Sequence, residues 1–423
     1  MSTVTASPSA GAVTGAPETA VYASLHAWAC WVRDLPSSGR THLLVDEAVS
    51  GAPIERHVRQ VLDGHGLRVT RHVVDSPAGL AELRQESDVI GDDPMIAVGG
   101  GRVIDRAKLL TLLSADAHAE KRLSTAHRCG FIVLPGGTRR RGALAVVPTT
   151  LGTGAEVSRS ACIQVHGRKR LVFGDGLRPD SAVHTPAATD TLPDDLVAEG
   201  VLEALLRLAS CYVGSLTDLP RQDALVREHA QRLVELGDRV LAARVAGRRT
   251  PGEVRTDAAR ISAESHSDAV LAGRDPFCDI TWPLANELSM AAGSRKLTAL
   301  AAITPPVWRR ISAGDRRLGC ARRLAGLWAV LRAASAGAVA DDPASGLRAL
   351  MDRWRISRAL PASPNRTVDP GDTATRLADS AVHAWGAGLP MLRGLSVTET
   401  SELYSEALDQ ITDENAEPTR ERR

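Results

Sequence analysis

Two segments rich in glycine and threonine carry the residues of this chain that are best suited to hold a phosphate. Gly99, Gly100 and Gly101 directly follow the apolar run 95–98 and precede a stretch with helical spacing. Because glycine has no Cβ, such a turn lets the backbone approach a pyrophosphate, to which the following helix offers free N–H groups. Segment 148–157, PTTLGTGAEV, follows another apolar run and adds hydroxyl donors. Three glycines alone are also typical of a tight turn that binds no ligand. The two segments together predict a dinucleotide site at the carboxyl ends of buried strands.

The elements that must position these segments alternate between strand and helix. Short apolar runs predict buried strands at 42–46, 67–74, 95–98 and 143–147, with a further strand at 130–134 inside the otherwise irregular stretch 115–142. Helical spacing predicts helices at 21–31, 54–62, 78–87 and 103–113. This alternation indicates an α/β fold with a doubly wound parallel sheet.

The sequence pattern changes after about Thr189. Strand signals fade, and Ala/Leu/Arg-rich helical patterns dominate to about Ile411. The clearest of these patterns predict helices at 196–212, 222–245, 256–272, 283–292, 322–335 and 397–411. We therefore expect an α/β N-terminal domain followed by an all-α C-terminal domain.

A chain of 423 residues is too long for one ordinary core, which favours two domains. We place a nucleotide-binding α/β domain at 20–189 and a helical domain at 190–412. Residues 1–19 are mostly small, without the basic start and apolar stretch of a signal peptide, and predict a disordered tail. The charged end, 413–423, predicts a frayed tail.

Composition excludes several classes of partner. The 51 basic and 50 acidic residues give a net charge of +1, which provides no general attraction to nucleic acid or to an anionic membrane. No apolar run approaches the length of a membrane span. The six cysteines form no CxxC pair, which indicates reduced thiols and a cytoplasmic protein.

Both phosphate-binding segments match a known pattern. Segment 98–108, VGGGRVIDRAK, resembles the GGGSxxDxAK stretch of iron-containing alcohol dehydrogenases, with Arg102 in place of serine. Segment 148–157 is similar to their PTTxGTGSEV stretch, with Ala155 in place of serine. Weaker likenesses lie at Leu192-Pro193 and at 388–396, so the resemblance covers roughly 21–411. The two nucleotide-loop motifs are its only highly specific parts.

The resemblance implies a nicotinamide coenzyme. The residues that it assigns to coenzyme contact are Gly99, Gly100, Gly101, Asp105, Thr149, Thr150 and Thr153. Asp46 ends the first apolar strand, where the family often has an acid that faces the adenosine ribose. A carboxylate there would bond the 2′-hydroxyl and repel a 2′-phosphate, which favours NAD with NADP as the alternative. A solvated turn aspartate is the other interpretation of Asp46.

The family's metal ligands are replaced in this chain. Relatives bind a divalent metal through a DAxxH helix, at whose positions this chain has Glu203 and Arg207. Arginine stays protonated and offers no lone pair to a metal. On the next such helix Asn286 and Met290 stand at the histidine positions, and the family's Pro-His-Gly is absent near Lys296. The resemblance thus predicts a divergent member with no metal ligands and without the usual divalent metal.

Two explanations follow from this loss. In the first, Arg207 or Lys296 stabilises the alkoxide that the metal would stabilise, and Glu203 is a general base or the ion-pair partner of Arg207. His266 and His383 are further titratable candidates, and a surface salt bridge is the plain interpretation of the Glu203–Arg207 pair. In the second, catalysis has been lost and the fold binds a nucleotide or a partner.

A neighbouring branch of the superfamily gives a third hypothesis. Gly200-Val201-Leu202-Glu203 fits the start of the GLxEVIK-like helix of dehydroquinate synthases, whose glutamate binds a metal. Leu206 stands where the lysine of that helix belongs, and the two metal histidines have no counterpart. A sugar-phosphate cyclase therefore ranks behind the other two hypotheses.

We predict an NAD-linked dehydrogenase that acts on an alcohol or carbonyl in a cleft between the domains. The expected substrate is a small molecule or a peptide, and the expected assembly is a homodimer. Some divergent relatives resemble dehydrogenases of natural-product pathways, such as daptide-type peptide maturation. There a side-chain hydroxyl is oxidised and the β-keto acid loses carbon dioxide, which suggests oxidative decarboxylation for this chain as well.

Overall fold

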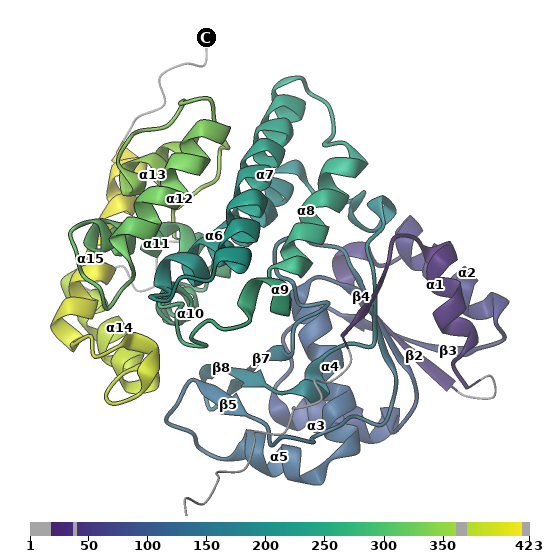
Figure 1. The fold of residues 1–423 in the computed structure, drawn as a ribbon. Coiled ribbons are helices and arrows are strands. Elements are labelled where there is room, and N and C mark those ends of the chain that lie inside the picture. Colours follow the sequence, from purple (N-terminus) through teal and green to yellow (C-terminus); the bar gives the residue numbers. More distant parts are fainter. Residues whose placement is uncertain (1–17, 37–39, 361–369, 417–423) are drawn as a thin grey trace, which may run out of the picture.

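The computed structural model describes residues 18–36, 40–360 and 370–416. Figure 1 shows an α/β part at the beginning of the chain and a helical part after it. The tails predicted at the two ends fall mainly on 1–17 and 417–423, outside the described residues. At the C-terminal side, helix α15 (Val397–Ala416) continues beyond 413, where we had expected fraying to begin.

A six-stranded parallel sheet organises the first part. Its strand order is β1-β9-β6-β4-β2-β3. The bounds are β1 Ala20–Tyr22, β9 Ser181–Val183, β6 Leu144–Pro148, β4 Met95–Gly99, β2 Arg40–Asp46 and β3 Arg68–Val74. All residues of β4 and β6 are buried, which explains their continuous apolar runs. The doubly wound parallel sheet predicted from the sequence is confirmed.

Helices cover both faces of this sheet. On one face α1 (Leu25–Arg33) and α2 (Pro53–Gly64) pack on Ile96 and Val98 of β4. On the other, α3 (Leu80–Ile90), α4 (Gly101–Ala115) and α5 (Ala117–Ser124) pack on Met95 and Ala97. Successive side chains of a strand point to opposite faces, so one strand serves both layers.

Several elements of this part differ from expectation. The helix predicted from residue 21 is wrong at its start, because Val21 and Tyr22 belong to β1 and pair with β9. The stretch 115–142 is not irregular throughout, since it contains α5. A second sheet has the strand order β5-β8-β7 and consists of β5 (Phe131–Val133), β8 (Arg168–Phe173) and β7 (Ser160–Val165). Of these strands only β5 was predicted from the sequence. Strand β8 is parallel to β5 and antiparallel to β7.

The remaining chain is helical, as expected. The bounds are α6 Asp194–Gly214, α7 Pro220–Val245, α8 Gly252–Glu264, α9 Asp268–Leu271, α10 Thr281–Ala292, α11 Lys296–Ser312, α12 Ala321–Ala334, α13 Pro343–Arg353, α14 Pro370–Trp385 and α15. Short 3-10 helices lie at η1 Glu47–Val49, η2 Asp175–Leu177, η3 Pro186–Thr189 and η4 Pro390–Leu392. The single helix predicted at 256–272 is wrong, because the chain leaves the helix at Ser265 and forms α8 and α9.

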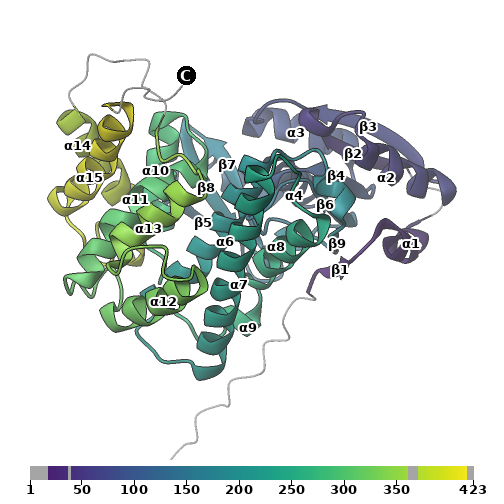
Figure 2. The ribbon, with the colours of Figure 1, turned by 90° about the horizontal axis from the view of Figure 1, so that it is seen from above.

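Helix α6 lies at the centre of the helical part, in contact with α7, α8, α11 and α12 (Figure 2). Fifteen of its residues are buried, which accounts for its nearly unbroken apolar sequence. The division predicted near Thr189 falls at the end of η3 and stays a prediction. No helix among the described residues is long and apolar enough to span a membrane. The six cysteines are free.

Candidate functional site

A cavity of about 960 Å³ lies between the carboxyl edge of the parallel sheet and the helical part. Most of the residues singled out from the sequence line it. These are Asp46, Gly100, Gly101, Asp105, Thr150, Thr153, Glu203, Arg207, His266 and Lys296. Gly99 and Thr149 do not line it, and Thr149 is buried behind the cavity wall. His383 is exposed on α14 and is not part of the site, so that candidate is wrong.

The glycine turn and the threonine loop are in direct contact. A Cβ on Gly100 would lie 3.0 Å from Thr150 Cγ2, and a Cβ on Gly101 would lie 3.2 Å from Thr153 Cγ2. A Cβ on Gly99 would come within 2.8 Å of Val103 Cβ, so the turn could not close onto α4 with a larger residue. The sequence placed these segments at two strand ends, and the fold brings them together into one surface.

The N-terminus of α4 fits the diphosphate of a nicotinamide coenzyme. The helix begins at Gly101, and its N-cap residue Gly100 has no side chain to satisfy the first amides. Uncapped N–H groups and the positive end of the helix dipole favour an anion at this place. The hydroxyls of Thr150 and Thr153 stand beside the turn as additional donors.

Asp46 ends β2 at the rim of the same cavity. Its Oδ1 accepts a hydrogen bond from the amide of Ala48 at 3.1 Å, which fixes the carboxylate at the start of η1. Among the described residues no hydrogen bond to Oδ2 occurs. A ribose hydroxyl could therefore donate to that oxygen.

Asp105 connects α4 to the second sheet. Its Oδ2 accepts a hydrogen bond from the amide of Cys162 in β7 at 3.0 Å. Burial raises the pKa of this carboxyl above its usual value, while the charge of Lys108 lowers it. Lys108 itself is fully buried and donates to the carbonyl oxygens of Ser158 and Ser160 at 3.0 and 2.8 Å.

Helix α6 lies against the cavity because two glycines, Gly152 and Gly200, allow its backbone to approach the threonine loop closely. A Cβ on Gly152, which has a φ of +89°, would lie 2.5 Å from the carbonyl oxygen of Gly200. A Cβ on Gly200 would lie 2.5 Å from Leu151 Cβ. The backbone of α6 thus rests on the threonine loop, which places Glu203, less than one turn further on, at the cavity.

Glu203 and Arg207 form a largely enclosed pair. Arg207 Nη2 lies 3.4 Å from Glu203 Oε1, and the two side chains are 12% and 15% exposed. Arg207 also lies over the ring of Trp282, 5.4 Å from its centroid, and 3.4 Å from Ser265 Oγ. Burial lowers the pKa of Arg207, against the charge of Glu203, which raises it. Since the pair is enclosed in the cavity wall, its interpretation as a surface salt bridge is wrong.

His266 sits over the threonine loop. A Cβ on Gly154 would lie 2.2 Å from His266 Cδ2, so the imidazole fills the space that a side chain would need. Its Nε2 is buried without a hydrogen-bond partner among the described residues. Burial, followed by the charges of Arg207 and Lys108, lowers the pKa of His266 well below its usual value. Its surroundings therefore favour the neutral form of the ring.

Lys296 is the first residue of α11 and lines the cavity. Burial lowers its pKa and the charge of Lys169 lowers it further, while the charges of Glu203 and Asp105 raise it. Cys162 and Lys169 line the cavity too, although sequence reasoning did not select them. They lie on the β7–β8 hairpin, whose short strands with charged residues gave no strand signal.

The residues in this cavity do not fit the family's divalent metal. Glu203 pairs with Arg207, Asn286 is buried outside the lining, and Met290 is a weak ligand for a hard dication. Over the described ranges no group of three or more His, Cys, Asp and Glu residues could hold a metal ion. Glu156, the acid of the threonine motif, pairs with His184 at 3.2 Å away from the cavity lining.

Comparison with known proteins agrees with this arrangement. Residues 26–186 match the family described as iron-containing alcohol dehydrogenase. This match places residues 26–186, the α/β part of the chain, in the superfamily of iron-containing alcohol dehydrogenases. The chain is 32% identical over 155 residues to the probable alcohol dehydrogenase EutG of Salmonella typhimurium, a match that covers 36% of each chain. To 4-hydroxybutyrate dehydrogenase of Cupriavidus necator it is 30% identical over 181 residues, or 41% of this chain and 45% of the relative.

The fold of two solved alcohol dehydrogenases extends over nearly the whole chain. An iron-containing alcohol dehydrogenase of Thermococcus thioreducens superposes with a TM-score of 0.73 at 16% identity, covering 93% of this chain and 98% of that one. The NADH-dependent butanol dehydrogenase A of Thermotoga maritima gives 0.74 at 14% identity, covering 92% and 97%. The matches to the curated relatives span well under two thirds of their length, and none of the superfamily's activities follows from similarity alone.

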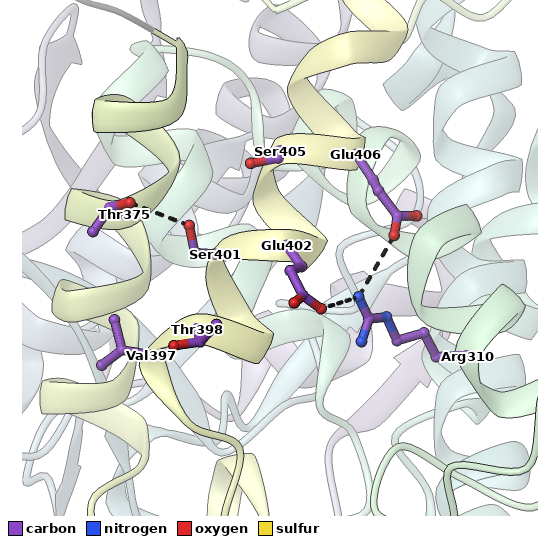
Figure 3. A pocket seen from close by; sticks show the side chains of 8 residues that line it. All are labelled: Arg310, Thr375, Val397, Thr398, Ser401, Glu402, Ser405 and Glu406. Carbon is purple, nitrogen blue, oxygen red and sulfur yellow. Dashed lines mark hydrogen bonds and ion pairs between the residues drawn. The ribbon is translucent and has the colours of Figure 1, made fainter.

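A second pocket, of about 540 Å³, lies among α11, α14 and α15 (Figure 3). Arg310 crosses it and pairs with Glu402 at 2.7 Å and with Glu406 at 3.6 Å. None of the residues singled out from the sequence lines this pocket. We therefore place the candidate site in the larger cavity.

Proposed function

We propose that this protein is an NAD-dependent dehydrogenase that oxidises an alcohol, or reduces the corresponding carbonyl, in the large cavity. The observation that carries the proposal is the contact of the glycine turn with the threonine loop beside an uncapped helix N-terminus. The same cavity is lined by Glu203 and Arg207 of α6, so a bound coenzyme and ionisable groups would meet there.

NAD is the expected coenzyme because Asp46 offers a free carboxylate oxygen at the end of β2. A 2′-phosphate would meet like charge at this position, whereas a 2′-hydroxyl could donate to it. NADP is the alternative, and a relative named NADPH-dependent aldehyde reductase YqhD of Escherichia coli is 28% identical over 220 residues. The bound coenzyme supplies the hydride acceptor.

The enclosed pair on α6 provides the polar chemistry. As the C–H bond of the alcohol breaks, hydride leaves for the coenzyme, and the hydroxyl proton passes to Glu203 as the C=O bond forms. Arg207 stabilises the negative charge that develops on the substrate oxygen, a role that an enclosed guanidinium fills without giving up its proton. His266 is the second candidate acceptor for that proton, because its buried Nε2 has no other partner among the described residues.

This mechanism needs no divalent metal, and a metal analysis tests that. We expect undiminished turnover after exhaustive chelation, whereas stoichiometric zinc or iron in the active protein would contradict the metal-free mechanism. We expect Arg207→Met to lower kcat by roughly 10²–10³-fold, the usual effect of losing one oxyanion donor, with unchanged NAD affinity. Arg221→Met, at an exposed position of α7, is the matched control. Undiminished kcat in Arg207→Met would remove Arg207 from the mechanism.

The finer proposal is that the substrate belongs to natural-product or peptide tailoring. The cavity volume of about 960 Å³ leaves room for more than a short alcohol beside a coenzyme. Oxidation of a β-hydroxy acid gives NADH and a β-keto acid, which then loses carbon dioxide. NADH and carbon dioxide should therefore form in equal amounts. Release of carbon dioxide in step with NADH supports oxidative decarboxylation; NADH without carbon dioxide contradicts it.

A catalytically silent nucleotide-binding protein is the alternative outcome. It predicts NAD binding by calorimetry and no turnover of any alcohol. Absence of binding to either nicotinamide coenzyme would contradict both hypotheses. A homodimeric state and a cytoplasmic location complete the proposal, and sedimentation and cell fractionation check them.

A further inference from the structure

The acids of the cavity near α6 already have donors within the chain. The pairs are Glu199 with Arg295 at 2.6 Å, Glu203 with Arg207 at 3.4 Å, Asp105 with the Cys162 amide at 3.0 Å, and Asp279 with the Trp282 amide at 3.2 Å. Each of these carboxylates is thus engaged by a cation or an amide. None of these hydrogen bonds involves Lys169 or Lys296, the other two cations that line this part of the cavity.

Two lysines of the cavity lack a hydrogen-bond partner of this kind within the described ranges. Lys169 of β8 and Lys296 of α11 both line the cavity, and neither is fully exposed. Over the described residues, neither ammonium makes a hydrogen bond or an ion pair with a protein group. Their charges act on one another, and burial together with Lys169 lowers the pKa of Lys296. Partly desolvated, unpaired ammonium groups cost free energy that an anion between them would offset.

The positions of the two lysines follow from the fold. In the β7–β8 hairpin Lys169 pairs with Gln164, so its side chain shares a face with Leu171. Gln164 and Leu171 line the cavity with it, which makes this face of the hairpin one wall. Helix α10 packs against β8, and the chain leaving α10 leads directly to Lys296 at the start of α11.

Ser294 adds an unused donor to the same place. Its Oγ is buried and has no hydrogen-bond partner among the described residues, although the residue lines the cavity. It stands two residues before Lys296 in the turn between α10 and α11. A buried hydroxyl without a partner usually indicates a water or ligand that completes its hydrogen bonds.

We propose that Lys169, Lys296 and Ser294 bind a carboxylate of the substrate, so that the substrate is a hydroxy acid with its hydroxyl toward Arg207. This inference rests on the proposed function and names the substrate class of that site. The coenzyme diphosphate has its own binding place at the glycine turn and the N-terminus of α4. A carboxylate has two oxygens, so it can accept from both ammonium groups at once. The carboxylate can belong to a free hydroxy acid or to the C-terminus of a peptide.

Matched acid and amide probes test the proposal. The free-acid arm compares 3-hydroxybutanoate with 3-hydroxybutanamide, and the peptide arm compares an acetylated tripeptide ending in threonine with its C-terminal amide. We expect kcat/KM with NAD to be at least about tenfold higher for the acid of the favoured arm, since hydrogen bonds to charged groups are the strong ones. The arm with the larger acid preference identifies the source of the carboxylate.

Variants locate the binding groups. Lys296→Met should raise KM for the favoured acid by roughly ten- to a hundredfold and leave KM for its amide unchanged. Lys296→Arg keeps the charge and should retain most of the acid preference. Lys121→Met, at an exposed position of α5, is the matched control and should change neither the KM for the acid nor the KM for the amide. If Lys169→Met weakens NAD affinity instead, that lysine belongs to the coenzyme site and the proposed cluster is wrong.

The outcomes separate this inference from the proposed function. If amides and acids are turned over equally well, the carboxylate site is refuted while the dehydrogenase stands. If nothing is turned over, calorimetry with the acids and amides on the NAD-saturated protein decides. Preferential binding of an acid that is lost in Lys296→Met supports the carboxylate site, and equal or absent binding refutes it.

Discussion

Replacing Gly200 by alanine tests the contact on which the position of α6 depends. A Cβ at this position would lie 2.5 Å from Leu151 Cβ and 2.9 Å from the Leu151 carbonyl oxygen. These atoms belong to the backbone and first side-chain carbon of the threonine loop, so they cannot rotate away. Either the loop or α6 must move.

Two opposing effects set the size of the stability change. Overpacking a close contact costs about 1–3 kcal/mol. Alanine in the interior of a helix gains about 1 kcal/mol over glycine. We therefore expect Gly200→Ala to lower the free energy of unfolding by about 0–2 kcal/mol. Turnover should fall far more, by roughly a hundredfold, because Glu203 and Arg207 move with the helix while the coenzyme does not.

Gly326→Ala is the matched control. Gly326 lies inside α12, is exposed, and has no heavy atom within 4 Å of a Cβ added there. This variant should be stabilised by up to about 1 kcal/mol with unchanged turnover. The assays are urea unfolding, NAD binding by calorimetry and initial rates of NADH formation. If Gly200→Ala matches Gly326→Ala in both stability and rate, the close approach of α6 to the threonine loop is refuted.

Two further predictions concern the α/β part of the chain. Asp46→Ser should shift the ratio of NAD to NADP affinity toward NADP by about tenfold or more, and an unchanged ratio in calorimetry would show that Asp46 does not face the ribose. Burial lowers the pKa of Lys108 to about 8, so between pH 8 and its usual 10.5 the unfolded chain binds the extra proton. The free energy of unfolding should therefore rise with pH across this window by at most about 3 kcal/mol relative to Lys108→Met. Parallel pH profiles of the two proteins would contradict the low pKa.

Patterns that depend on local sequence predicted the positions of the glycine turn and the threonine loop. The apolar run before Gly99 and the run before segment 148–157 are strands buried on both faces, and such strands are recognisable without tertiary information. The helix after the glycine turn and α6 were predicted from their helical spacing, which is likewise a local pattern. Their mutual contact followed from the rule that parallel strands end at one edge of the sheet.

The elements that sequence reasoning missed share a physical cause. Strand β8 begins with Arg168-Lys169-Arg170, whose charges hide its alternation, although Lys169 faces a cavity rather than bulk water. Helix α11 contains Pro305 and Pro306, a residue type that normally ends a helix, and none of the clearest helical patterns fell on this segment. Burial against neighbouring helices holds both elements in place, and such packing cannot be read from a single chain.

The close packing of His266 against Gly154 has a consequence for protein engineering. The imidazole occupies the volume that any side chain at 154 would require, and the φ of +59° at 154 further restricts that position to glycine. A larger residue at 154 is therefore compatible only with a smaller one at 266, and even then with backbone strain. Libraries meant to reshape this wall should vary the two codons jointly, since changing 154 alone would yield mostly misfolded clones.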